Sequence, residues 1–401
     1  MTIEPRRAAL RIALTVAALL PALPAQPADG HAPQAPGARL ELGTGAAFGP
    51  DGTLFAVSKD GGHLVLRRSP DAGITWSAPI PVNAVPEAIA ANGDSFPKLA
   101  FTAGGDILVA WSKPLAKPYT GEIRLARSRN GGTSFDDPIT VHHDRSEITH
   151  RFESIVVGAD NSVLVAWIDK RDLQAAQAGK TPYRGAAIYS AVSHDGGKSF
   201  APERKVADHS CECCRIAVAR DRDGAPLLFW RHVFAPNERD HALARLKPDG
   251  TPEAVQRATF DRWKIDGCPH HGPSLAVDGQ GLRHAVWFNE KDGTGRVHYG
   301  RLTRGGDGLR VEGQRTVGGP RAAHADLLVA GNRLAIAWKE FDGERTRLHI
   351  QVSRDGGQTF VAQEITATEG ASDQPRLLAR GEALYLFWRT EKEYFRVLHL
   401  P

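Results

Sequence analysis

The sequence predicts an all-β protein built as a single β-propeller of seven blades, with six blades as the alternative. Two repeats predict this fold. A short turn with the pattern Ser-x-Asp/Asn-x-Gly-x-Ser/Thr-aromatic begins at Ser69, Ser128, Ser193 and Ser353. A tryptophan closes a short apolar run at Trp111, Trp167, Trp230, Trp287, Trp338 and Trp388. Four short strands in each repeat, at about 50 to 60 residues per repeat, are typical of propeller blades.

The recurring turn is predicted to join the third and fourth strands of a blade. Asp or Asn followed by glycine suits a tight turn, because the short side chain bonds nearby backbone amides and glycine accepts a positive φ. The aromatic residue that ends each turn is expected to pack into the core: Trp76, Phe135, Phe200 and Phe360. The four turns are therefore interpreted as structural.

Seven innermost strands are predicted along the chain, one for each blade. They begin near Ala46, Lys98, Phe152, Arg215, Ser274, Asp326 and Arg376. The last repeat ends at Pro401 after three strands, and Ala38–Leu42 is available to supply a fourth. The N- and C-terminal strands are thus expected to close the ring, which removes exposed sheet edges. No amphipathic helix pattern of useful length follows residue 40.

The N-terminus predicts export. Arg6, Arg7 and Arg11 precede the apolar run IALTVAALL, and small residues and prolines follow it. Residues 1–28 are therefore interpreted as a secretory signal peptide, with an uncleaved anchor as the alternative. Residues 29–37 read as a flexible Pro/Ala leader, and residues 38–401 as the propeller. The expected location is periplasmic or secreted.

The charge balance argues against several classes of partner. The chain has 50 basic and 46 acidic residues, without a block of Lys or Arg, so nucleic-acid binding is not expected. No apolar run of membrane-spanning length follows the N-terminus, so no membrane span is expected after signal cleavage. A glycan or small-molecule ligand is the expected partner, and a monomer the expected state.

The four turns resemble the Asp box of the sialidase-like (BNR repeat) propeller superfamily, and the resemblance covers nearly all of residues 38–401. This superfamily includes sialidases, other glycosidases, assembly factors and binding proteins, so the resemblance implies a fold more than an activity. It implies that the boxes lie on the face away from the central funnel. Ligands would meet the loops that lead into the innermost strands and those joining second to third strands.

The resemblance also implies what a sialidase site would need. That chemistry uses a Tyr nucleophile with a Glu partner, a separate carboxylic acid and three arginines around a sugar carboxylate. The candidates are Arg151, Arg215 and Arg376, with Asp94 or Asp169 as the acid. The first repeat reads GTGAAFGP and lacks the family's early arginine, and no Tyr–Glu pair stands at a matching position. Binding of a ligand, glycan or soft metal is therefore preferred, with an exo-α-sialidase-like glycosidase as the alternative.

All four cysteines fall in loops that lead into two consecutive innermost strands: Cys211, Cys213, Cys214 and Cys268. In an oxidising compartment an even number suggests disulfides, with Cys268 paired to one of the other three. Reduced or redox-active thiols are a further alternative.

A soft-metal site for copper or zinc competes with the disulfides, because thiolates and imidazoles both suit these ions. Strand alternation would point Cys211 and Cys213 to one side and Cys214 to the other. Two thiolates with His270 or His271 could then complete a four-ligand set. Two further histidines, His150 and His324, are outer candidates.

Overall fold

The structure, a computed structural model, describes residue 1 and residues 40–401 except Cys268 and Asp307. The predicted signal peptide and leader therefore lie outside the described residues, apart from Met1. Within the described part of the chain, no helix is long and apolar enough to cross a membrane.

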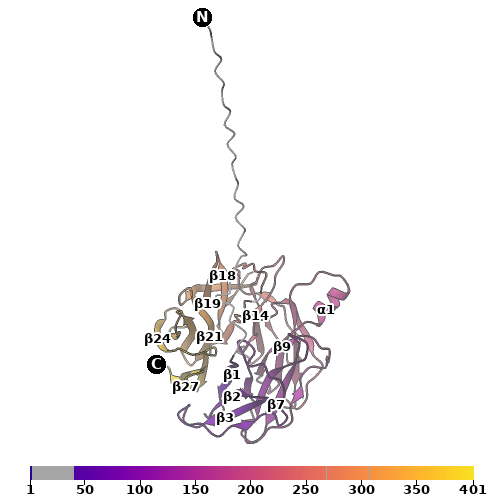
Figure 1. Cartoon of the computed structure of the whole chain (residues 1–401), viewed down its shortest axis with the longest axis vertical. Helices are drawn as coiled ribbons and strands as arrows, with labels where there is room; N and C mark the ends of the chain where they lie inside the picture. The colour runs from indigo at the N-terminus through magenta and orange to yellow at the C-terminus, as the bar shows by residue number, and fades with distance from the viewer. Residues whose placement is uncertain (2–39, 268, 307) are drawn as a thin grey trace. The chain divides into compact units, whose positions relative to one another are not determined.

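Seven antiparallel sheets follow one another along the chain as the blades of a propeller (Figure 1). Blade 1 contains β1 (Thr44–Phe48), β2 (Leu54–Asp60), β3 (His63–Ser69) and β4 (Ile80–Pro81). Blade 2 contains β5 (Lys98–Phe101), β6 (Ile107–Pro114), β7 (Gly121–Ser128) and β8 (Ile139–Thr140). Blade 3 contains β9 (His150–Val157), β10 (Val163–Asp169), β11 (Ala186–Ser193) and β12 (Arg204–Ser210). Blade 4 contains β13 (Ala217–Arg220), β14 (Pro226–Arg231), β15 (His241–Arg245) and β16 (Gln256–Arg257).

The remaining three blades complete the ring. Blade 5 contains β17 (Ser274–Val277), β18 (Arg283–Lys291), β19 (Thr294–Gly305) and β20 (Gly308–Val317). Blade 6 contains β21 (Ala322–Ala330), β22 (Arg333–Phe341), β23 (Thr346–Ser353) and β24 (Val361–Thr368). Blade 7 contains β25 (Arg376–Arg380), β26 (Ala383–Thr390) and β27 (Tyr394–His399). The prediction of an all-β propeller with seven blades is confirmed.

The ring closes between blades 7 and 1. The Thr44 amide donates to Asp373 Oδ2 at 2.9 Å, and Arg376 Nε donates to the Thr44 carbonyl at 2.8 Å. The described residues 40–43 form no strand, so the sheet of blade 7 has three strands and the expected fourth is not formed there. The blades instead meet through β1 and β25, the innermost strands.

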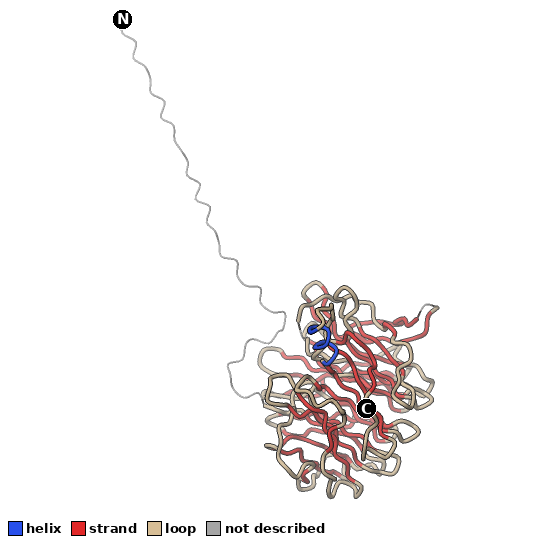
Figure 2. The backbone as a smooth tube through the Cα atoms, turned by 90° about the vertical axis from the view of Figure 1, so that its right-hand side faces the viewer, coloured by secondary structure: helices blue, strands red, loops and turns tan. Residues whose placement is uncertain are grey.

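Further details differ from the sequence-based expectation. The helix α1 (Arg171–Ala178) forms between β10 and β11, where no helix was predicted (Figure 2). Strand β21 begins at Ala322, four residues before the predicted start at Asp326. A bulge between Ala323 and Asp326, with His324 at a φ of 54°, adds residues that strict alternation does not anticipate.

The repeated tryptophans lie between neighbouring blades. Trp111, for example, is fully buried and packs in a cluster with Phe55 and Val57 of the preceding blade. Its indole Nε1 donates to Glu87 Oε1 at 2.9 Å. The indoles of four other blades also find an oxygen acceptor at 2.7 to 3.0 Å: Trp167, Trp287, Trp338 and Trp388. The exception is Trp230 of blade 4, whose buried Nε1 has no hydrogen-bond partner among the described residues.

The Asp boxes lie in the loops between third and fourth strands, as predicted. In blade 3, Ser193 Oγ donates to Asp195 Oδ1 at 2.7 Å and accepts from the Gly197 amide at 2.8 Å. Burial opposes ionisation of Asp195, but hydrogen bonds from Ser199 and Ser193 outweigh it and lower its pKa to about 2. The box glycine also packs on the preceding blade: a Cβ added at Gly357 would lie 1.8 Å from the Tyr299 hydroxyl. These turns are structural.

Candidate ligand-binding face and cysteine cluster

The topology gathers two sets of loops at one end of the propeller. The loops that lead into the innermost strands and those that join second to third strands lie together, opposite the Asp boxes. We call this end the funnel face. The predicted site residues that the structure describes lie in these loops or at the adjoining strand ends.

At the centre of this face, Arg215 and Asp94 form a buried ion pair. Arg215 Nη1 lies 2.9 Å from Asp94 Oδ1 and donates to Gln374 Oε1 at 2.8 Å. Asp94 precedes blade 2, Arg215 precedes blade 4 and Gln374 precedes blade 7. Because blades 4 and 7 stand on opposite sides of a seven-membered ring, these side chains meet across its axis. We call them the axial clasp.

Backbone groups of two further blades complete the clasp. Arg215 Nε donates to the Pro273 carbonyl at 3.1 Å, and its Nη2 donates to the Ala325 carbonyl at 2.9 Å. The Gly272 amide donates to Asp94 Oδ2 at 2.9 Å. Burial opposes ionisation of Asp94, but Arg215 and the hydrogen bonds hold its pKa below the usual value. Both charges are thus satisfied by the protein itself.

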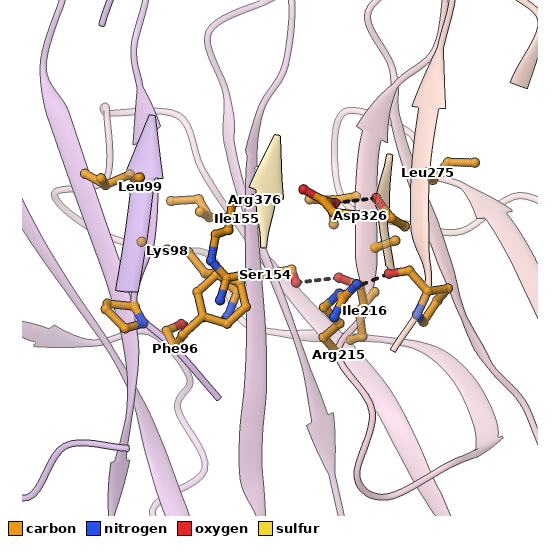
Figure 3. Close-up of a pocket in the computed structure, with 17 residues that line it drawn as sticks. Phe96, Lys98, Leu99, Ser154, Ile155, Arg215, Ile216, Leu275, Asp326 and Arg376 are labelled. Carbon is orange, nitrogen blue, oxygen red and sulfur yellow. Dashed lines mark hydrogen bonds between the residues drawn. The ribbon is translucent and has the colours of Figure 1, made fainter. Parts of the chain in front are cut away.

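A cavity of about 220 Å³ is lined by the innermost strands, with Arg215 and Arg376 among its side chains (Figure 3). The Arg376 guanidinium lies 3.2 Å from the ring centre of Phe96, and Lys98 Nζ lies 3.4 Å from the same ring. Burial lowers the pKa of Lys98 to about 8, against the opposing effect of Glu153. Arg376 also bonds Asp373 and blade 1, so its main contacts hold the ring together.

The other two candidates for sialidase-type chemistry lie apart from this cavity. Asp169 is fully buried and accepts hydrogen bonds from Trp167 and Arg171, which occupy both of its oxygens. Arg151 lies at the start of β9 and does not line the cavity, and its guanidinium is 4.9 Å from the ring of Phe152. The three arginines therefore do not converge on the one cavity.

The tyrosines do not supply an activated nucleophile. Among the described residues, the tyrosine hydroxyls that donate to carboxylates pair with aspartates: Tyr183 with Asp208 and Tyr189 with Asp172, each at 2.8 Å. Burial, followed by these bonds, raises the pKa of both phenols, which disfavours the phenolate. The described residues do not assemble the Tyr–Glu pair that a sialidase needs.

The three cysteines that the structure describes lie together. The sulfur of Cys211 lies 3.7 Å from that of Cys213 and 3.9 Å from that of Cys214, and the last two are 3.9 Å apart. All three side chains are buried at the boundary of blades 3 and 4. Strand alternation predicted that Cys214 points away, which is wrong: residues 211–214 form a bend between β12 and β13, so alternation does not apply.

Two guanidinium groups accompany the sulfurs. Arg239 Nη1 lies 3.6 Å from Cys211 Sγ, and the Cys211 amide donates to the Arg231 carbonyl at 2.9 Å. Hydrogen bonds from Cys213 and Cys214, and the positive charges of Arg231 and Arg239, lower the pKa of Cys211 well below its usual value. This thiol therefore has strong thiolate character.

The candidate histidines occupy other places. His150 is fully buried, stacks on His142 and lies 3.5 Å from Asp169. The ring of His271 stacks on that of His324 with centroids 4.5 Å apart, and His324 Nδ1 lies 3.1 Å from the Gln374 amide of the axial clasp. Among the described residues, the metal-ligand atoms that gather within 4.8 Å are the three sulfurs without a histidine. His270 is exposed, and Cys268 lies outside the described residues.

Sequence analysis did not single out the exposed aromatic side chains. The described chain has four aromatic residues with well-exposed side chains: Tyr119, Phe260, Phe341 and Tyr394. Tyr119, Phe341 and Tyr394 lie at joins between second and third strands, and Phe260 lies in the loop that leads into β17. All four are therefore on the funnel face. The sequence repeat places these residues in loops of the funnel face, but it does not show that their side chains are exposed.

Comparison with known proteins supports the propeller fold of this chain. No protein-family model matches the sequence, and no curated protein matches it. A PL25 ulvan lyase bound to -[GlcA(1-4)Rha3S]- is 11% identical, with a TM-score of 0.56 over 88% of this chain and 90% of that chain. The polysaccharide lyase Uly1 is 9% identical, with a TM-score of 0.55 over 90% of each chain. A protein of unknown function from Dyadobacter fermentans is 14% identical, with a TM-score of 0.51 over 78% of this chain and 96% of that chain.

At these identities the likeness shows the fold alone. The chain is a seven-bladed propeller, and the propeller fold that the Asp boxes implied is confirmed.

Proposed function

We propose that this protein is a glycan-binding propeller that recognises an anionic oligosaccharide on its funnel face. The observation that carries the proposal is the gathering of all four well-exposed aromatic side chains on that face. Exposed aromatic rings in the loops of one face can each contact a ligand that lies across it, and aromatic residues are enriched at interfaces. Sugar rings offer flat arrays of C–H bonds that pack against aromatic faces, while their hydroxyls remain in water.

Two arginines of the funnel face, Arg389 beside Tyr394 and Arg151 at the start of β9, favour an anionic sugar. The Arg389 guanidinium lies 5.6 Å from the ring centre of Tyr394, and its Nη1 donates to Thr44 Oγ1 at 3.2 Å. Among the described residues, neither Arg389 nor Arg151 forms an ion pair with a carboxylate. Guanidinium groups bind carboxylates and sulfates through paired hydrogen bonds. A uronate or sulfated sugar would supply the missing counter-charge.

The axial clasp sets how such a glycan would bind. Because Arg215, Asp94 and Gln374 meet across the propeller axis, the glycan would lie on the funnel face rather than enter the centre of the propeller. This arrangement suits recognition of a short stretch of chain by several loops. A PL25 ulvan lyase of the same fold was solved with a bound glycan, which makes such a ligand reasonable for this architecture without assigning it.

Binding can be measured by calorimetry with alginate oligosaccharides, which carry uronates, and with dextran oligosaccharides as the neutral control. We expect alginate binding that weakens as salt rises, because Arg–carboxylate attraction is screened. Tyr119→Ala and Tyr394→Ala should each weaken it roughly tenfold, or about 1.4 kcal/mol. The matched control is Ile74→Ala, an 83% exposed residue in an Asp box on the opposite face. Equal binding of dextran, or equal loss in the control, would contradict the proposal.

We also propose that the protein is exported, on the basis of its first 28 residues. The basic, apolar and small-residue order of this segment supports the proposal. Expression of the full chain in a Gram-negative host, followed by fractionation and N-terminal sequencing, tests it. A shortened protein in the periplasm is expected, and a full-length cytoplasmic protein would contradict the proposal.

A further inference from the structure

We propose that Cys211, Cys213 and Cys214 bind one Cu(I) ion as a trigonal three-thiolate site. The three sulfurs form a nearly equilateral triangle with sides of 3.7, 3.9 and 3.9 Å. The point equidistant from all three lies about 2.2 Å from each, which is a metal–sulfur bond length. An ion can therefore enter with little movement of the side chains, and each thiol releases its proton as the bond forms.

The two arginines at the cluster are the second observation. Arg231 is buried, with 1% of its surface exposed, and its donors meet the carbonyl oxygens of Arg239, His271 and Phe288. Arg239 contacts Cys211. Among the described residues, neither guanidinium forms an ion pair with a carboxylate. A buried charge without a counter-charge is costly, so the buried Arg231 calls for an anionic partner, and the half-buried Arg239 adds a second positive charge beside the sulfurs.

Charge distinguishes Cu(I) from Zn(II). Three thiolates carry three negative charges, which one Cu(I) and two guanidiniums balance. Zn(II) would leave an excess positive charge at the apolar boundary of blades 3 and 4, next to Ile216 and Phe152. Soft thiolate ligands also favour Cu(I). Both the spacing and the charge of the site therefore suit Cu(I).

The hydrogen bonds of the repeated tryptophans also indicate an anionic group in blade 4. In blades 2 and 5 the repeated tryptophan donates to a carboxylate from the loop that leads into the innermost strand, Glu87 and Asp261 respectively. In blade 4 that loop is the cysteine segment, and the Nε1 of Trp230 is buried without an oxygen acceptor. Trp230 and the three cysteines belong to one packed cluster. The cysteines of blade 4 thus occupy the loop from which blades 2 and 5 supply an acid.

The first test is Cu(I) titration of the full-length protein under anaerobic, reducing conditions, against the chromophoric chelator bicinchoninate. One Cu(I) per chain is expected, and X-ray absorption should show three sulfurs at about 2.2–2.3 Å. A site that takes Zn(II) in preference to Cu(I), or a copper ion with nitrogen ligands, would overturn the proposal. So would fewer than three free thiols in unfolded, metal-free protein purified without reductant from an exporting host, because a disulfide would then occupy the site.

Variants separate the three sulfurs from the remaining cysteine. Cys211→Ser, Cys213→Ser and Cys214→Ser should each weaken Cu(I) binding at least 100-fold, whereas Cys268→Ser should bind Cu(I) as the wild type does. Circular dichroism checks that each variant is folded. Arg239→Gln keeps all sulfurs and should weaken binding roughly tenfold, since it removes one compensating charge. Loss of binding in Cys268→Ser would refute a site made of these three thiolates, and the absorption spectrum of the wild type decides the matter if a variant does not fold.

Discussion

Replacing Asp94 by alanine should destabilise the whole propeller, because this carboxylate is the counter-charge of the axial clasp. It accepts Arg215 Nη1 at 2.9 Å, the Gly272 amide at 2.9 Å and the Arg215 amide at 3.2 Å. The variant would leave a buried guanidinium without its anion and two buried amides without an acceptor. Breaking a buried ion pair by removing one partner costs about 3–5 kcal/mol.

Equilibrium unfolding in urea is the assay, with the free energy of unfolding compared between wild type and variant. Asp94→Asn keeps the shape and one acceptor oxygen, so its loss should be smaller. The control is Asp249→Asn, at an exposed ion pair with Arg204 that spans 3.7 Å, where no measurable change is expected. A loss in Asp94→Ala of less than about 1 kcal/mol, the scale of surface pairs, would refute the idea that the clasp holds the ring.

The stability that Asp94 contributes should also depend on pH. Because the pKa of Asp94 in the folded protein lies below its ordinary value, its stabilisation is complete above that ordinary value. It is then lost as the pH falls through the folded pKa. The difference in unfolding free energy between wild type and Asp94→Asn should therefore be constant above pH 4 or so and shrink below it.

Two further predictions concern other parts of the fold. Gly357→Ala should lower the free energy of unfolding by more than about 1 kcal/mol, because its Cβ would lie 1.8 Å from the Tyr299 hydroxyl. Gly356 has a similar positive φ but open space around it, so Gly356→Ala should lower the stability less. Thermal unfolding of both variants is the measurement. Burial lowers the pKa of His142 to about 3, and its Nε2 accepts the Ile123 amide at 3.1 Å, so the folded state requires the neutral ring. The stability that His142 contributes should thus be complete above pH 6.5 and decrease as the pH falls below that value. When the free energy of unfolding is measured from pH 7 to 4.5, it should decrease less in His142→Gln than in the wild type.

The fold was predictable because its determinants are local. Each Asp box bonds within seven residues of its first serine, and each blade repeats the same strand pattern, so blade number and order follow from the chain. Strands at Lys98, Ser274 and Arg376 begin where predicted. The bulge near His324 and the helix α1 were missed, because neither leaves a periodic pattern to count.

The centre of the funnel face was only partly predictable. Arg215, Asp94 and Gln374 were brought together by contacts spanning 121 and 159 residues, which no local pattern specifies. The cysteines were recognised by their position in the repeat, but their shared direction depends on a bend that alternation rules do not treat. The exposed aromatic residues of the funnel face were not predicted, because the sequence does not show which side chains are exposed on the same face.

The axial clasp also restricts how a polymer can be handled. Because Arg215 joins Asp94 and Gln374 across the ring, a long chain has no route from one end of the molecule to the other through the middle. Threading, and any processive movement that depends on it, is therefore closed to this propeller. A polymer would bind on one face only and would dissociate before it bound again, so several copies of the protein could bind one polymer chain at the same time.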